Sequence, residues 1–172
     1  MPEAYPTLAG GQRLRASLLR SMQPQTVRKT ADDSRSATTT FADDPHLTFA
    51  VEANAVYVMD GWIKYFADPT PDLKVQFTTP SGTLGEWAWL MPGSGTAATG
   101  TVGYSIRTET NDVGGSRTGY GTSDSTMFTP ISGLWRVAST AGSITLQWAQ
   151  NTSNATATVM YTDSWLRFLR IA

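Results

Sequence analysis

From Ala37 onward, hydrophobic and polar residues alternate in short runs that turn residues separate. A period of two places successive side chains on opposite faces of an extended chain, so each run predicts a β-strand. The clearest run alternates Ile144, Leu146 and Trp148 with polar or small residues. The expected strands are 37–42, 46–51, 55–66, 73–78, 84–90, 102–108, 127–131, 134–138, 144–149, 155–162 and 165–171.

The run at 55–66 has hydrophobic residues on both faces, which is typical of a strand in the middle of a sheet. Many short strands joined by loops indicate two packed sheets. We therefore expect an all-β fold, a jelly-roll-like β-sandwich over residues 37–172. Residues 91–126 are rich in Gly and poor in large hydrophobic residues, so we expect long loops at the distal or partner-facing end.

Residues 1–36 follow a different pattern. Leu14, Leu18 and Met22 recur at every fourth position, which predicts one hydrophobic face of a helix of about three turns, ended by Pro24. A helix of this length is marginal alone in water, so we expect it to dock on another subunit or another protein.

Basic residues outnumber acidic ones in the same segment, and Arg13 and Arg20 lie within the predicted helix. The part that follows the helix, residues 25–36, is polar and is expected to be extended. We predict that residues 1–36 form an N-terminal attachment arm with one short helix.

Composition and charge exclude several classes of protein. The chain has no Cys, which excludes disulfides, thiolate metal sites and cysteine nucleophiles. Its net charge of −1 and the lack of a basic stripe argue against nucleic acid as a partner. No hydrophobic run reaches the ~20 residues that span a bilayer, and the N-terminus lacks a secretory signal pattern. We expect no membrane partner.

His46 is the only histidine, so a Ser-His-Asp arrangement would have to use it, together with Asp43 or Asp44. The same three residues offer oxygen and imidazole ligands for a divalent metal. Two aspartates before Pro45 more often begin a turn by accepting hydrogen bonds from nearby backbone amides, and we favour that interpretation. We expect no catalytic residue, no metal and no cofactor, and we expect His46→Ala to leave any activity intact.

Other chemical motifs are weaker. Carboxylates that could serve glycoside hydrolysis have no spacing that pairs them. Residues 93–98 match a dinucleotide fingerprint only superficially, because no strand precedes them and no helix follows. Asn151 and Asn154 begin glycosylation sequons, which we interpret as turn residues between strands. The carboxylates considered for glycoside hydrolysis are Glu86, Glu109, Asp112 and Asp124.

Six tryptophans are many for 172 residues. Trp87 and Trp89 share one face of the run 84–90, where two rings could stack on the apolar face of a sugar. The alternative is that they fill the sandwich core or a subunit interface, where Trp is favoured. We favour core or interface.

Several segments resemble motifs of a known group of proteins. LAGGQRLRASLLRSMQPQTVRKTAD, residues 8–32, resembles the opening motif of many phage structural proteins, although Arg20 stands where that motif more often has Asn. Three further segments are similar to a group of proteins encoded by phages of actinobacteria. They are VEANAVYVMDGWIKY, TTPSGTLGEWAW and the closing TAGSITLQWAQNTSNATATVMYTDSWLRFLRIA. The resemblance, to virion structural proteins of actinobacterial bacteriophages, covers nearly the whole chain.

The resemblance implies a virion structural protein that is made in the host cytoplasm. It would be displayed on the tail or fibre apparatus as a minor tail protein, or would decorate the head, through its N-terminal arm. The implied partners are other phage structural proteins and further copies of the chain, a homotrimer being the expected state. The alternative is a carbohydrate- or receptor-binding module for a host-surface glycan, possible at Trp87 and Trp89. A depolymerase is disfavoured because no convergent acid–base set is visible.

Overall fold

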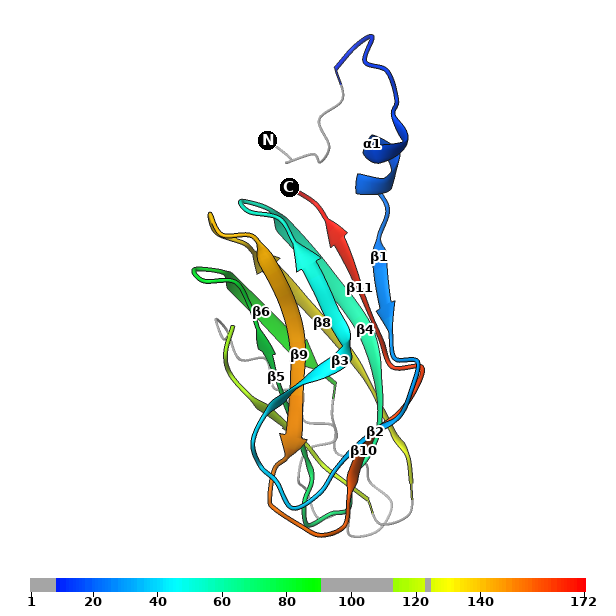
Figure 1. Cartoon of the computed structure of the whole chain (residues 1–172), viewed down its shortest axis with the longest axis vertical. Helices are drawn as coiled ribbons and strands as arrows, with labels where there is room; N and C mark the ends of the chain where they lie inside the picture. The colour runs from blue at the N-terminus through cyan, green and yellow to red at the C-terminus, as the bar shows by residue number, and fades with distance from the viewer. Residues whose placement is uncertain (1–8, 91–112, 123–124) are drawn as a thin grey trace.

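A computed structural model of the chain describes residues 9–90, 113–122 and 125–172. These residues form one short helix and two antiparallel sheets that pack face to face (Figure 1). The elements are α1 (Ala16–Ser21), β1 (Gln25–Arg28), β2 (Asp33–Arg35), β3 (Ala42–Val51), β4 (Val56–Phe66), β5 (Leu73–Thr78), β6 (Leu84–Trp89), β7 (Arg117–Gly119), β8 (Met127–Arg136), β9 (Gly142–Gln150), β10 (Thr158–Met160) and β11 (Trp165–Arg170).

The larger sheet, sheet A, is built around β4. One side of β4 pairs with β8, which in turn pairs with β6. Its other side pairs with β11 and, further along, with β10, which are themselves flanked by β1 and β2. The smaller sheet, sheet B, has the order β3-β9-β5-β7. The expected central position of 55–66 is therefore confirmed.

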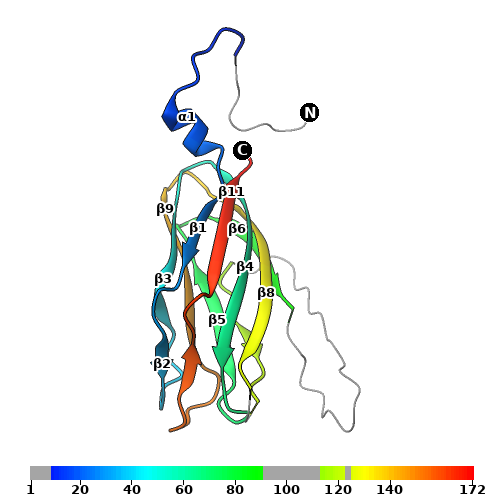
Figure 2. The same ribbon diagram turned by 90° about the vertical axis from the view of Figure 1, so that its right-hand side faces the viewer.

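The chain changes sheet at every connection from β3 to β9. This alternation gives the neighbours β3-β9-β5-β7 in sheet B and β4-β8-β6 in sheet A, which is jelly-roll connectivity. Figure 2 shows the two sheets edge-on, with α1 beyond one end of the sandwich and the C-terminus at that same end. The predicted all-β sandwich is confirmed.

The core lies between the sheets and follows the predicted alternation. In β4 the side chains of Tyr57, Met59, Ile63 and Tyr65 point inward and are buried, whereas the residues between them face out of sheet A. Burial of such large side chains stabilises the fold by roughly 1.5–3 kcal/mol each. Gly61 takes one of the inward positions because a Cβ there would lie 2.5 Å from the carbonyl oxygen of Trp165.

The second half of the expected arm belongs to the sandwich. β1 and β2 are edge strands of sheet A, paired with β11 and β10. Lys29, which lies between them, is completely buried. Residues 25–36 therefore differ from the expectation of a separate extended arm, and the part that projects from the sandwich ends near Pro24 (Figure 2). Their polar pattern is that of edge strands, which have only one neighbouring strand.

Three smaller differences concern the strands. Residues 37–41 are not a strand, and the short strand β7 was not expected. The two runs at 127–131 and 134–138 lie largely in one strand, β8, which pairs with β4 without interruption from Met127 to Arg136. Gly133 within it leaves room for β6, because a Cβ there would lie 2.8 Å from the carbonyl oxygen of Glu86. The expected strand at 102–108, and most of the glycine-rich stretch 91–126, lie outside the described residues.

Candidate functional site

The projecting segment, residues 9–24, carries the residues that the sequence assigns to attachment. Leu14, Leu19 and Met22 are 64%, 48% and 41% exposed, and no residue of α1 is buried. Leu18 is half-buried. Arg13 and Arg20 are exposed. Hydrophobic side chains in this segment are therefore not covered by the sandwich below it.

The helix itself is shorter than expected. It spans Ala16–Ser21 instead of about three turns, so Leu14 precedes it and Met22 caps its C-terminus. Arg15 at the N-cap makes no side-chain capping hydrogen bond, and the first turn has no acidic residue. A helix without either stabilising feature remains short unless tertiary contacts extend it.

Trp87 and Trp89 cannot form a platform on which a sugar stacks, because their rings do not lie on the protein surface. Both rings are buried, with 3% and 7% of their surface exposed. Trp87 packs edge-on against Phe77 of sheet B, with ring centroids 5.1 Å apart, and against Trp89. Of the two interpretations, core packing is the one that the structure supports.

Exposed aromatic rings lie instead on the outer face of sheet A, the face turned away from sheet B. Trp62 of β4 is 40% exposed and Phe128 of β8 is 50% exposed, and their ring centroids are 5.8 Å apart. Trp165 of β11 lies opposite Trp62 in the register and points to the same face. We call these three residues the outer aromatic row.

Charged and hydroxyl groups surround the outer aromatic row. Lys64 lies over the ring of Phe128, at 5.8 Å from its centroid, and over that of Tyr161, at 5.5 Å. Asp60 accepts two hydrogen bonds from Arg167, of 2.8 and 2.9 Å, and this hydrogen bonding, together with the negative charge of Asp60, raises the pKa of Arg167. The row thus combines exposed rings with fixed donors and acceptors.

The hydrophobic pattern of 55–66 predicts burial on both faces of that strand, so this row is not expected from the sequence. A signal was present: on the outward side of that run, Trp62 stands between Asp60 and Lys64. A ring flanked by two charges on one face of a strand indicates a solvated face.

The cluster around His46 is neither a triad nor a metal site. Asp44 is buried, and its Oδ1 accepts hydrogen bonds from the backbone amides of His46 and Leu47, as the turn interpretation predicts. Its Oδ2 contacts Lys29 and Trp148, whereas Asp43 accepts a hydrogen bond from Gln147. Among the described residues, no three His, Asp or Glu side chains are grouped to hold a metal ion.

The remaining motifs are placed as follows. Asn151 and Asn154 lie between β9 and β10, where Asn154 accepts a hydrogen bond from the backbone amide of Thr156, as turn residues do. Glu86 is exposed on β6, on the outer face of sheet A. The other three carboxylates considered for hydrolysis, and the stretch 93–98, lie outside the described residues.

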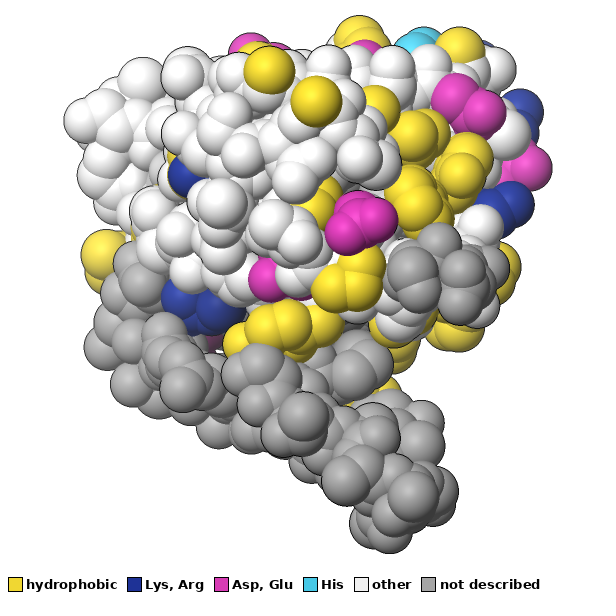
Figure 3. All heavy atoms as spheres, turned by 90° about the horizontal axis from the view of Figure 1, so that it is seen from below, with side chains coloured by type: hydrophobic (Ala, Val, Ile, Leu, Met, Phe, Trp, Pro, Cys, Tyr) yellow, Lys and Arg dark blue, Asp and Glu magenta, His cyan; other side chains and the backbone are white. Residues whose placement is uncertain are grey.

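Figure 3 views the molecule from the end opposite α1. Uncharged polar and backbone atoms dominate the described surface there, with hydrophobic side chains in scattered groups and few charged ones. Among the described residues, no helix has the length and hydrophobicity needed to cross a membrane.

The fold and these surfaces define an all-β, jelly-roll-type sandwich with a projecting N-terminal segment and an exposed aromatic row on one sheet. No protein-family model matches the chain, and comparisons with curated proteins and with solved structures give no match.

Proposed function

We propose that the protein is a structural subunit of a bacteriophage particle, attached through its projecting N-terminal segment so that the sandwich is displayed. The single observation that carries this proposal is the exposure of Leu14, Leu19 and Met22 in a segment that leaves the end of the sandwich. Hydrophobic side chains that the chain itself does not cover usually mark an interface. The resemblance of residues 8–32 to the opening motif of phage structural proteins supports the same role.

The test is to locate the protein in intact particles of the phage that encodes it, by cryo-EM of the particles with their neighbouring subunits. We expect density for the sandwich at a symmetric position on the tail, fibre or head, with residues 9–24 in contact with another subunit. Purified particles that lack the chain in mass spectrometry, while the infected-cell lysate contains it, would exclude the proposal.

The outer aromatic row favours a second candidate function, binding of a host-surface glycan. Exposed rings beside Lys64, Asp60 and Arg167 offer both stacking surfaces and hydrogen-bonding groups, which are the elements that bind a sugar. This site replaces the pair Trp87 and Trp89 and belongs to the same role if the protein lies at a receptor-binding tip.

The second candidate is tested by titrating oligosaccharides from the host envelope into the protein and following tryptophan fluorescence. Trp62→Ala and Phe128→Ala should each weaken binding at least about tenfold, since ring stacking is lost. Phe41→Ala is the matched control, because Phe41 also lies under a lysine, with Lys74 at 4.6 Å, outside sheet A. Equal affinities for all three variants would contradict a glycan site at the row.

A further inference from the structure

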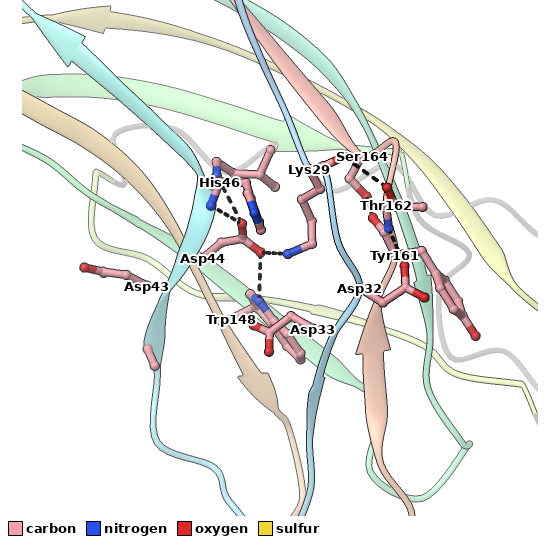
Figure 4. Close-up of polar contacts among 12 residues, drawn as sticks. Lys29, Asp32, Asp33, Asp43, Asp44, His46, Trp148, Tyr161, Thr162 and Ser164 are labelled. Carbon is pink, nitrogen blue, oxygen red and sulfur yellow. Dashed lines mark hydrogen bonds and ion pairs between the residues drawn. The ribbon is translucent and has the colours of Figure 1, made fainter.

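The only buried lysine among the described residues is held against a buried aspartate. Lys29 Nζ lies 2.7 Å from Asp44 Oδ2, and both side chains have none of their surface exposed (Figure 4). Lys29 comes from the segment between β1 and β2 at the edge of sheet A, and Asp44 comes from β3 at the edge of sheet B. The pair therefore joins the two sheets.

Hydrogen bonds and strand pairing fix the backbone at both Lys29 and Asp44. The amide of Lys29 donates to the carbonyl of Ser164, and its own carbonyl accepts from Asp163. The β3–β9 register shifts between Asp43 and Thr48, and this irregularity turns Asp44 into the interior next to Pro45, which has no amide hydrogen to leave unpaired.

The contacts of Asp44 differ at its two oxygens. Oδ1 accepts two backbone amide hydrogens, from His46 at 2.9 Å and Leu47 at 3.1 Å. Oδ2 accepts from Trp148 Nε1 at 3.2 Å and contacts Lys29 Nζ. Two backbone donors aimed at one carboxyl oxygen are the arrangement that stabilises the negative oxygen of a tetrahedral intermediate in acyl transfer. The lysine lies beside the other oxygen, the one that would leave.

We propose that Lys29 and Asp44 condense into an intramolecular amide, an isopeptide crosslink between sheet A and sheet B. A proton first passes from the Lys29 ammonium to Oδ2 of Asp44, which gives a neutral amine and a carboxylic acid. Nζ then attacks Cγ, so that a C–N bond forms and negative charge develops on Oδ1, facing the amides of His46 and Leu47. The C–Oδ2 bond breaks as Nζ gives up a second proton, and the oxygen leaves as water.

The condensation requires no oxidant and no other reactant, because the atoms and charges of one ammonium and one carboxylate equal those of one amide and one water. The 2.7 Å contact places Nζ within ~4 Å of Cγ, so a small approach brings the two atoms to the ~3–3.5 Å at which aligned groups react as if at effective concentrations on the order of 10⁵ M or more. Complete burial excludes the bulk water that would favour hydrolysis of the product. Burial also makes the unreacted ion pair costly to keep, since both charges are desolvated.

The decisive measurement is the intact mass of the purified full chain under denaturing conditions. We expect a mass lower than the sequence mass by one water, and fragmentation of a proteolytic digest should place the link between Lys29 and Asp44. A chain at its full sequence mass after prolonged incubation would overturn the proposal and leave the pair as an ion pair. The measurement does not depend on the proposed function.

Variants assign the bond to these two residues. Lys29→Met should have its full sequence mass, whereas the control Lys64→Met, which changes a lysine on the outer face, should still lack one water. Asp44→Asn keeps an oxygen acceptor for the amides of His46 and Leu47, and it should either lose ammonia or stay at full mass. Loss of water from Lys29→Met or from Asp44→Asn would refute the assignment.

Discussion

Burial separates the large aromatic side chains among the described residues into a core group and a surface group. Trp87 and Trp135 pack around Phe77 in the core, with ring centroids 5.1 and 5.2 Å from it. Trp62 and Phe128 contact each other on a surface that solvent reaches. Substitution of a ring in the first group should therefore change stability, and substitution in the second group should change binding.

The first prediction compares a buried and an exposed tryptophan of sheet A, on β6 and β4, the two strands that flank β8. Trp87→Ala should lower the free energy of unfolding by about 3–5 kcal/mol, because it leaves a cavity in the core. Trp62→Ala should cost less than about 1 kcal/mol, because much of its ring remains in water. Urea denaturation followed by circular dichroism measures both. Equal losses of unfolding free energy in the two variants would mean that the outer face of sheet A is covered in the folded chain.

The second prediction concerns the dependence of stability on pH that Asp72 causes. Burial raises its pKa, and this effect is opposed by the hydrogen bond from the backbone amide of Gly121. The folded state therefore holds the Asp72 proton to higher pH than the unfolded chain does. Its contribution to stability falls as pH rises from the ordinary carboxyl range through the raised pKa, so the carboxylate is unfavourable at neutral pH.

Asp72→Asn should remove that pH-dependent loss. Asn keeps an acceptor for Gly121 and tolerates the positive φ of 51° at this position. We expect the variant to be more stable at pH 7 by a few tenths of a kcal/mol, since solvent screens a half-buried group, and to show no gain at pH 3. Thermal melts at the two pH values measure this difference. A larger gain at pH 3 than at pH 7 would contradict the raised pKa.

At the scale of elements, the central strands could be predicted and the edges could not. β4, β5, β6 and β9 appear in the sequence because one or both of their faces are hydrophobic, which gives a clear period. β1 and β2 are polar, and they are held by pairing with β11 and β10, more than 120 residues away along the chain. A pattern within one segment contains no information about such partners.

The same limit explains which parts of the candidate site were found. The exposure of Leu14 and Met22 in the projecting segment follows from local periodicity, whereas exposed Leu19 lies outside the predicted set and Leu18, which belongs to it, is half-buried. The pair Lys29–Asp44 and the pair Trp62–Phe128 each join residues of different strands, so only the register brings them together. Lys29 had the pattern of an exposed polar residue, and its burial depends on a partner from the other sheet.

The third prediction concerns the projecting segment as an element. Deletion of residues 1–23 should leave the sandwich folded, with a Tm within a few degrees of the full chain, because no residue of α1 is buried. The same deletion should prevent incorporation into particles. The deletion must end before Gln25, because a longer one would remove β1 and, from residue 29 on, the buried lysine.

Point variants in the full-length chain separate hydrophobic docking from chain length. Leu14→Ser with Met22→Ser should reduce incorporation, measured by quantitative mass spectrometry of purified particles. Gln12→Ser in the same segment is the matched control and should incorporate normally. Normal incorporation of the double variant would mean that these hydrophobic side chains do not carry attachment.

For the whole molecule, the distribution of exposed hydrophobic residues marks the surfaces on which we expect partners. The large exposed hydrophobic side chains among the described residues fall in two places: the projecting segment, and the outer face of sheet A with Trp62, Leu84 and Phe128, together with Leu90 directly after β6. Sheet B contributes no such residue within the part of the chain that the structure describes. Two separated surfaces suit a subunit that attaches by one and associates or binds by the other.

The last prediction is the oligomeric state. We expect the full chain to form a homo-oligomer, a trimer being the expected state, since closed cyclic symmetry covers the same surface on every subunit. Light scattering coupled to size-exclusion chromatography measures its molar mass. If the outer face of sheet A is the contact, Trp62→Ser with Phe128→Ser should shift the mass to that of a monomer, whereas Phe41→Ser should not. A trimer that survives the double substitution would assign assembly to the projecting segment and leave the outer aromatic row accessible to a glycan. A monomer at micromolar concentration, with residues 1–24 intact, would contradict self-assembly and leave other particle proteins as the partners of both surfaces.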